Sequence, residues 1–492
     1  MTSSTIGAVA TSSRGVRGAV AAAHPLARDA AVATLARGGS AVDATIAAHA
    51  VIAVVMPHAA GLGGDMIALV RPGRGDVQAI NGTGLSPEIA PETWRTDGGS
   101  SVTVPGLVAG WVTVHERWGR LRLSEVLAES IRIAHTGYRV DAGLAHAFET
   151  QRSRLRRYGG DRWSLATTAV GDNWMQPELA ELLDAIGRRG SSAFYHGDTA
   201  AHIATEVAAH GGTLSASDLA AHRTDTPEPI ETTWNGGRLI VQPPSTQGVL
   251  LAMAARWLDA AGLHPDERLQ HTLIEVTEAA FAHRDAAASA GSALLETPLT
   301  VDPDMAMNRG GPRAYLHTAG VAVADADGMV VSSLVSVFDD FGSAVFVPEL
   351  GITLNNRAAG FTAPPNQARP ATRPVHTLAP AMLVDREGHA TGIATPGADG
   401  QVQTLLQVLA HLRYLGLGLD EAIAHPRWRS EAGALLIEDG HPDAHDLEDR
   451  GHHTVARALG DDVFGAVVAA GYDTEGPFAV GDWRRNVVTG AQ

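Results

Sequence analysis

The chain offers a restricted set of side chains that can act as a nucleophile. Its 492 residues contain no cysteine, and none of the 37 residues counted as lysine or arginine is a lysine. Thiolate chemistry, lysine Schiff bases, disulfides and cysteine-ligated metals are therefore excluded. Serine, threonine, aspartate, glutamate, histidine and tyrosine remain as candidate nucleophiles.

Thr318 is the candidate that the local sequence singles out. It precedes a valine-rich run, an Asp-Ala-Asp-Gly turn at 325–328 and a second valine-rich run, a pattern that predicts a hairpin. With the turn centred between its two middle residues, Thr318 lies opposite Val335 and beside Ser336. Two hydroxyl groups would then meet at the head of a buried strand. A purely structural threonine explains the same pattern, because threonine is a favoured strand residue.

The elements that must position this hairpin follow a simple order. Alanine-rich helical patterns come first, valine-rich strands dominate the middle of the chain, and further helices follow. This order indicates layers of helix and sheet stacked around one core. The predicted helices cover 25–38, 40–56, 124–137, much of 248–290, and 401–415, and the predicted strands cover 66–70, 238–242, 320–325, 329–338, 343–346 and 381–384.

Composition narrows the classes of partner. A formal net charge of -17 repels phosphate backbones, so nucleic acid is not an expected partner. Residues 1–16 lack the apolar core of a secretory signal, and no run of 18 apolar residues occurs without polar interruption. We therefore expect no membrane partner and a cytoplasmic location.

Short motifs along the chain carry a resemblance to a known family. In their order and spacing they resemble the gamma-glutamyltranspeptidase superfamily of N-terminal-nucleophile hydrolases. The motifs are Ala22–Ala27, Gly38–Ala44, Pro57–Gly64, Val104–Gly110, Gly212–Asp218, Pro243–Ser245, Asp325–Gly328, Phe341–Ser343, Gly351–Asn356, Arg373–Pro374 and Pro396–Gly397.

The resemblance implies an α+β fold, a four-layer αββα sandwich, that is made as a precursor. Counting back from the turn at 325–328 places the self-cleavage point between His317 and Thr318. Residues 1–317 would then form a large subunit and residues 318–492 a small one, and together they would make a single αββα domain. The two fragments would be each other's partner in a heterodimer, with a dimer of heterodimers possible, and the family needs no cofactor or metal.

The resemblance also assigns catalytic roles. Cleavage would free the α-amine of Thr318; an α-amine ordinarily has a pKa of about 7.7–8.0, which suits a general base for the threonine's own hydroxyl. Ser336 matches the hydroxyl that hydrogen-bonds the nucleophile. Gly397 and Ala398 match the glycine pair whose backbone N–H groups stabilise the oxyanion, although Ala398 departs from glycine. His376 and Thr377 stand where relatives carry a substrate-binding serine pair.

The sequence departs from true gamma-glutamyl enzymes where those enzymes hold the glutamyl group. Thr83 replaces the arginine that binds the α-carboxylate, Gly360 replaces the aspartate that binds the α-amine, and Phe338 replaces an asparagine on the second hairpin strand. A zwitterionic glutamyl group would be desolvated there without partners. Arg357, next to Asn356, offers a bidentate fork instead, and we assign both to substrate binding; a structural salt bridge is the alternative role for Arg357.

The expected activity is hydrolysis of an amide-type bond in a small, carboxylate-bearing substrate, a pattern that resembles the oxamate amidohydrolase branch. An acyltransferase or a C–C hydrolase of secondary metabolism is the alternative chemistry. An uncleaved pseudoenzyme that binds a partner is the alternative from another class.

Two further patterns give only weak evidence of a binding site. Gly61–Gly64 lacks the spacing of a dinucleotide-binding loop. The histidines near 441–453 are explained as surface residues of an acidic tail rather than as a metal site.

Overall fold

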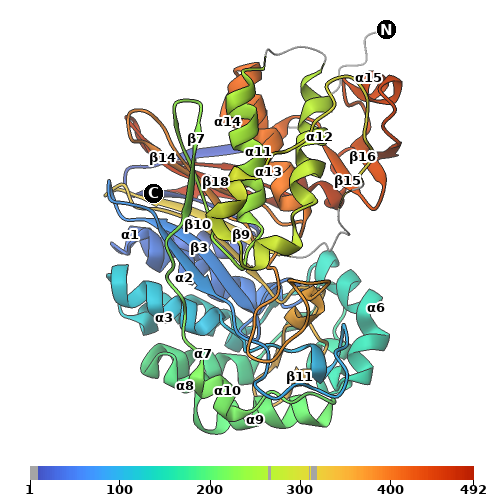
Figure 1. The fold of residues 1–492 in the computed structure, drawn as a ribbon. Coiled ribbons are helices and arrows are strands. Elements are labelled where there is room, and N and C mark those ends of the chain that lie inside the picture. Colours follow the sequence, from blue (N-terminus) through green and yellow to red (C-terminus); the bar gives the residue numbers. More distant parts are fainter. Residues whose placement is uncertain (1–8, 264–267, 310, 312–317) are drawn as a thin grey trace.

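The computed structural model describes residues 9–263, 268–309, 311 and 318–492. Over these residues, helices and strands are mixed around two large antiparallel sheets (Figure 1). The predicted α+β class is confirmed at this level. Among the described residues, none of the helices combines the length and the apolar character that crossing a membrane would require.

The two sheets bring together strands from distant parts of the sequence. In spatial order, the six-stranded sheet consists of β20 (Val488–Ala491), β2 (Gly18–Ala22), β9 (Ala319–Asp325), β10 (Val330–Ser336), β3 (Asp65–Arg71) and β4 (Gln78–Gly82). The seven-stranded sheet consists of β1 (Thr11–Arg14), β19 (Gly476–Gly481), β18 (Val468–Asp473), β14 (Ala390–Ala394), β13 (Ala381–Val384), β8 (Gly237–Val241) and β7 (Ile230–Trp234). Smaller sheets pair β5 (Tyr138–Arg139) with β6 (Asn173–Trp174), β11 (Phe346–Val347) with β12 (Ile352–Thr353), and β15 (Trp428–Glu431) with β16 (Ala434–Glu438) and β17 (Thr454–Arg457).

Helices pack on the outer face of each large sheet. On the six-stranded sheet these are α1 (Pro25–Ala36) and α2 (Ala41–Val55). On the seven-stranded sheet they are α11 (Gly248–Ala261) and α13 (Gly400–Ala410), and α12 (Leu269–Phe281) packs against these two helices. The other helices are α3 (Leu107–Trp118), α4 (Leu123–Val126), α5 (Ala128–Thr136), α6 (Ala142–Arg157), α7 (Pro177–Arg189), α8 (Ser192–Tyr195), α9 (Gly197–Ala209), α10 (Ala216–Ala221), α14 (Leu419–Ala424) and α15 (Ala444–Asp449).

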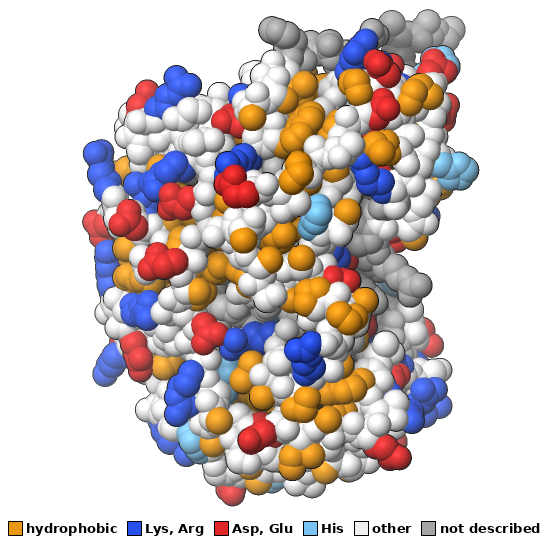
Figure 2. Space-filling view, in the orientation of Figure 1, with side chains coloured by type: hydrophobic (Ala, Val, Ile, Leu, Met, Phe, Trp, Pro, Cys, Tyr) orange, Lys and Arg blue, Asp and Glu red, His pale blue; other side chains and the backbone are white. Residues whose placement is uncertain are grey.

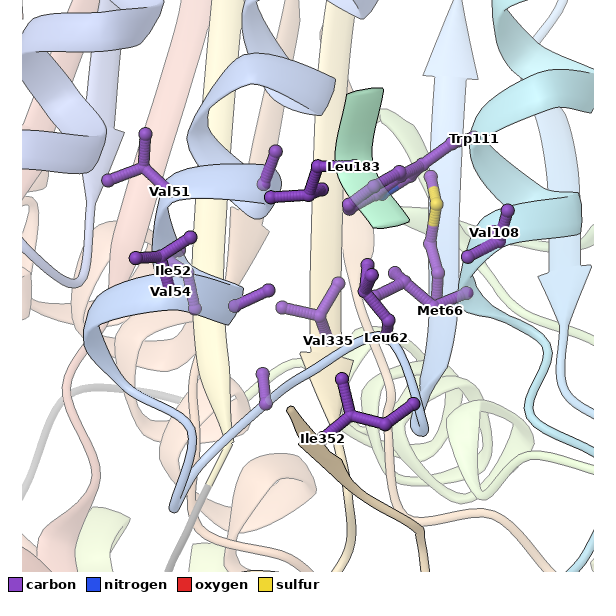
Figure 3. Packing of buried hydrophobic residues seen from close by; sticks show 14 of the residues in the cluster. Val51, Ile52, Val54, Leu62, Met66, Val108, Trp111, Leu183, Val335 and Ile352 are labelled. Atoms are coloured by element: carbon purple, nitrogen blue, oxygen red, sulfur yellow. The ribbon is translucent and has the colours of Figure 1, made fainter. Parts of the chain in front are cut away.

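Local sequence explains these helices well. Pro25 occupies the first turn of α1, and Ser40 and Asp43 form a capping box that starts α2, as such residues do elsewhere. Every residue of α2 is buried, because the helix lies between the six-stranded sheet and further helices. Figure 3 shows side chains of α2 packed near Val335 of β10. The predicted helix at 124–137 is two helices, α4 and α5.

Alternation along β9 sets the direction of Thr318. Ala319 and Val321 face the α1 and α2 layer, whereas Ala322 and Ala324 pack against residues of the seven-stranded sheet. Side chains alternate along a strand with period two. Thr318 therefore points into the space between the two sheets. On the outside of the molecule, basic and acidic side chains are intermixed over the face shown in Figure 2.

The hairpin register differs from the predicted one by a single residue. Val335 pairs with Ala319, not with Thr318, and continuing the ladder places Thr318 opposite Ser336. The reason is a turn one residue longer than expected. The carboxylate of Asp325 accepts the backbone N–H groups of Asp327 and Met329, and the N–H of Asp325 reaches the carbonyl of Met329 at 3.0 Å.

Asp325 also ties this hairpin to α2, because its second carboxylate oxygen accepts the N–H of Ala41 at 2.9 Å. We predict that Asp325→Ala lowers the free energy of unfolding by about 2–4 kcal/mol, since three backbone N–H groups, two of them buried, lose their acceptor. Asp327→Ala is the matched control, because its side chain is 64% exposed and its loss should cost less than about 1 kcal/mol. Urea denaturation measures both; equal losses would contradict the role given to Asp325.

Candidate active site

Thr318 lies at the wall of a cavity of about 780 Å³. Only 7% of its surface is exposed. Gly320 of β9 and Pro396, which follows β14, line the same cavity. Gly320 has to be small, because a Cβ there would lie 2.8 Å from a methyl group of Val468. The close approach of the two sheets thus fixes the strand that begins beside Thr318, whereas His317, the residue predicted to precede the cleavage point, lies outside the described residues.

Ser336 ends β10 at the same level of the sheet as Thr318. It is buried, and its hydroxyl accepts the backbone N–H of Phe338 at 2.9 Å. Its backbone pairs on the other side with Asp65 of β3. Three neighbouring strands therefore place Thr318, Ser336 and Asp65 in one row across the sheet.

The predicted oxyanion loop follows β14 and precedes α13. Gly397 has φ +126° and Ala398 has φ +49°, so both occupy the left-handed region that L side chains rarely adopt. Within the described part of the chain, no acceptor pairs with the backbone N–H of either residue. Two adjacent N–H groups held in this way suit a developing negative charge.

Gln247 holds this loop in place. Its buried side-chain amide donates to the carbonyl of Ala398 at 2.9 Å and to that of Thr377 at 2.7 Å. Its own N–H donates to the carbonyl of His376. The 376–377 segment and the oxyanion loop are therefore joined by one side chain at the start of α11.

A buried charged cluster surrounds Asp65. The Nε of Arg357 lies 3.0 Å from Asp65 Oδ2, and the Nε2 of His376 lies 3.3 Å from the same oxygen. At most 1% of any of the three residues is exposed. The Nδ1 of His376 accepts the N–H of Leu378 at 3.1 Å, so the neutral ring carries its proton on Nε2 and donates it to Asp65.

The pKa values in this cluster follow from burial and charge. Burial alone would raise the pKa of Asp65, but the hydrogen bond from His376 and the charge of Arg357 outweigh it and hold the pKa below its usual value. Burial lowers the pKa of His376 to about 4, and the charge of Arg357 acts in the same direction. His376 is thus neutral at neutral pH, and Arg357 is the cation that balances Asp65.

The guanidinium of Arg357 is only partly used by the protein. Its Nη1 and Nη2 atoms, and Oδ1 of Asp65, are buried and have no hydrogen-bond partner among the described residues. The guanidinium carbon lies 4.5 Å from the centre of the Phe338 ring, so the aromatic ring covers one face of the cation. A fork of two free donors in a water-poor setting matches a carboxylate.

The other predicted binding residues are engaged within the protein. The hydroxyl and N–H of Thr83 both donate to Asn81 Oδ1. The side-chain amide of Asn356 bonds Thr96 and Asp339. Their contact with a substrate stays a prediction, as does that of Thr377, whose carbonyl is held by Gln247.

Sequence reasoning missed Asp65 and Gln247. Asp65 directly follows Gly61–Gly64, and an acidic residue at the start of the apolar run 66–70 is a signal that it needs a buried partner. The surface interpretation of the C-terminal histidines is wrong for two of them. His441 and His452 are buried, and His452 Nε2 lies 2.9 Å from Nδ1 of His271 in α12, whereas His445 and His453 are exposed as expected.

Comparison with known proteins identifies the family. The family model described as gamma-glutamyltranspeptidase matches residues 27–491. The chain belongs to the gamma-glutamyltranspeptidase family. The predicted resemblance is therefore confirmed over nearly the whole chain.

Relatives of this gamma-glutamyltranspeptidase family member include two proenzymes. The oxamate amidohydrolase proenzyme of Klebsiella pneumoniae is 33% identical over 84% of each chain. The glutathione hydrolase-like YwrD proenzyme of Bacillus subtilis is 30% identical over 94% of this chain and 96% of its own. Among solved structures, the cephalosporin acylase of Bacillus halodurans has a TM-score of 0.86 and 27% identity, with 100% of this chain and 99% of that one covered. This gamma-glutamyltranspeptidase family member is a hydrolase or acyltransferase.

The strained alanine of the oxyanion loop gives a test of the geometry. A β-branched residue at positive φ is strongly disfavoured, so Ala398→Val should lower the free energy of unfolding by about 1–3 kcal/mol. Ala398→Gly should leave the unfolding midpoint unchanged or slightly raised, because glycine adopts this conformation freely. Thermal denaturation compares the two, and an Ala398→Val protein as stable as the parent would show that the loop is not held in this conformation.

Proposed function

We propose that this protein is a self-processing N-terminal-threonine hydrolase that cleaves the amide-type bond of a small, carboxylate-bearing substrate. Thr318 is the nucleophile, and it becomes the first residue of the small subunit when the bond after His317 is cut. The position of Thr318 beside a cavity, at the head of a central strand and level with Ser336, supports this assignment. The proenzyme names of its relatives support processing of the chain.

The packing of the two large sheets and their helices supports the proposed four-layer fold and the proposed pairing of the two fragments. Helices cover the outer face of each sheet, and a separate apolar cluster lies between the sheets. This order supports the four-layer αββα arrangement. Cleavage would split it into residues 1–317 and 318–492, yet β9 and β10 of the small subunit lie between β2 and β3 of the large one. The two fragments therefore share one sheet and are proposed to remain a heterodimer.

The proposed reaction has two steps, formation of an acyl ester on Thr318 and its hydrolysis. The Thr318 hydroxyl attacks the substrate carbonyl while the freed α-amine takes its proton. The N–H groups of Gly397 and Ala398 stabilise the oxyanion, and the ammonium returns the proton to the leaving amine. Water then hydrolyses the acyl ester on Thr318 by the same route in reverse. Ser336 is proposed to hydrogen-bond the nucleophile and so to orient it.

Arg357 is the residue from which we infer a carboxylate on the substrate. Its two unpartnered Nη groups are held in place by Asp65, which fixes the guanidinium through Nε alone. A carboxylate bonded directly to the scissile carbonyl would satisfy both donors at once. Oxamate has this arrangement, and the oxamate amidohydrolase relative supports the choice.

A second candidate is an acylase or acyltransferase with a larger substrate. The cavity of about 780 Å³ beside Thr318 has room for a bulkier acyl or amine group than oxamate provides. The fold of the cephalosporin acylase supports this alternative. Product analysis with and without an added amine separates transfer from hydrolysis.

Variants of Thr318 test the nucleophile. Thr318→Ala should remain one full-length chain without activity, because the hydroxyl that attacks the preceding peptide bond is gone. Thr318→Ser should still cut, more slowly. Denaturing electrophoresis over time follows the fragments, and a Thr318→Ala protein that cuts and turns over like the parent would contradict the assignment.

The Arg357 fork is tested by substrate charge. Arg357→Lys keeps a cation beside Asp65 but loses the paired donors, so kcat/KM for oxamate should fall about 10- to 100-fold. The neutral diamide oxamide lacks the carboxylate, so its kcat/KM should fall less than about threefold in the same variant. Ammonia release measures both substrates; an equal fall for the two would argue against a carboxylate at Arg357.

A further inference from the structure

Two buried carboxylates lie outside the Thr318 cavity and have no part in the proposed chemistry. Glu275 and Glu278 belong to α12, where residues three apart share a face. Glu275 is fully buried and Glu278 is 6% exposed. Burying two like charges on one face of a helix is costly unless both are bound by donors.

Their donors come from the chain that leads toward Thr318. We call Met307, Asn308, Arg309 and Gly311 the lead segment. Glu275 accepts the N–H of Met307 at 2.9 Å and pairs with Nη1 of Arg309 at 2.9 Å. Glu278 accepts the N–H of Arg309 at 2.9 Å. Both carboxylates therefore bind the backbone of this segment and not merely its side chains.

The lead segment is held from the other side by β15 and the turn after it. Glu278 also accepts the hydroxyl of Ser430 at 2.6 Å, and the carbonyl of Gly311 accepts the N–H of Ala432 at 3.0 Å. Gly311 lies so close to this strand that a Cβ would be 2.1 Å from the carbonyl oxygen of Ser430. Figure 1 shows α12 and β15 in the same part of the molecule. The segment is thus clamped between the proposed large and small subunits.

This clamp limits where the following chain can go. Residues 312–317 separate Gly311 from Thr318, and seven steps of extended chain reach at most about 25 Å. A fixed Gly311 therefore restricts the approach of the peptide bond before Thr318 to the hydroxyl that attacks it. Orientation of this kind strongly affects the rate of an intramolecular reaction.

We propose that Glu275 and Glu278 are positioning residues for self-cleavage, which fix the lead segment and thereby align the bond before Thr318. The proposal rests on cleavage at that bond. Neither carboxylate lines the Thr318 cavity or contacts the Arg357 cluster. These contacts should therefore affect the rate at which the precursor cleaves itself, but not the activity of the cleaved enzyme.

Self-cleavage of purified precursor, followed by electrophoresis, tests this role. Glu278→Ala and Gly311→Ala should slow cleavage about 10- to 100-fold, since a misplacement of about 1 Å has effects of this size. Glu278→Gln should cut at nearly the parent rate, because its carbonyl oxygen can still accept the N–H of Arg309 while its NH2 group donates to the hydroxyl oxygen of Ser430. Met305→Ala, at an exposed position (53%) of the same stretch, is the matched control.

The outcomes separate the two proposals. If the parent never cuts before Thr318, the proposed function fails. If the parent cuts there and Gly311→Ala and Glu278→Ala cut equally fast, only the clamp is refuted. Gly311→Ala leaves the buried carboxylates intact and decides the question should Glu278→Ala not fold. Cleaved Gly311→Ala enzyme should keep kcat/KM within about twofold of the parent, because no contact to the reacting groups changes; a fall as large as the loss in cleavage rate would indicate general damage instead.

Discussion

The buried carboxylate of Asp65 is the interaction on which the site depends. One oxygen of this residue holds both Arg357 and His376, at 3.0 and 3.3 Å. A charge without such partners would not persist at a fully buried position. Because Arg357 is anchored through Nε alone, the rest of its fork remains available. The same carboxylate begins β3, and its backbone pairs with Ser336, so the binding groups and the hydroxyl row share one rigid frame.

The fold explains how distant segments meet at that frame. Two sheets approach closely enough that Gly320 must lack a side chain, and the ends of β9, β10 and β14 meet at the edge of the space between them. Thr318, Ser336 and the oxyanion loop are the residues at those three ends. Gln247 joins the oxyanion loop to the segment that carries His376. Strand ends, and not long flexible loops, thus carry the groups that the proposed reaction needs to hold still.

Much of this arrangement could be predicted from the sequence, and the failures have physical causes. Helices with clear caps, such as α1 and α2, and the apolar strands β9 and β10 were predicted, because their patterns are local. The predicted register of the hairpin was wrong by one residue, because the Asp325 carboxylate stabilises a longer turn. Hydrophobic periodicity does not reveal such an interaction. Strands β18 and β19 went unrecognised because they are rich in glycine and alanine. Asp65 was missed since its partners Arg357 and His376 are 292 and 311 residues away along the chain.

Sequencing the amino termini of the purified wild-type protein tests the central claim most directly. Two fragments should be present, and the smaller one should begin with the threonine at position 318. A protein that remains one chain, or whose smaller fragment begins at another residue, would contradict the account of a threonine that serves as both nucleophile and base.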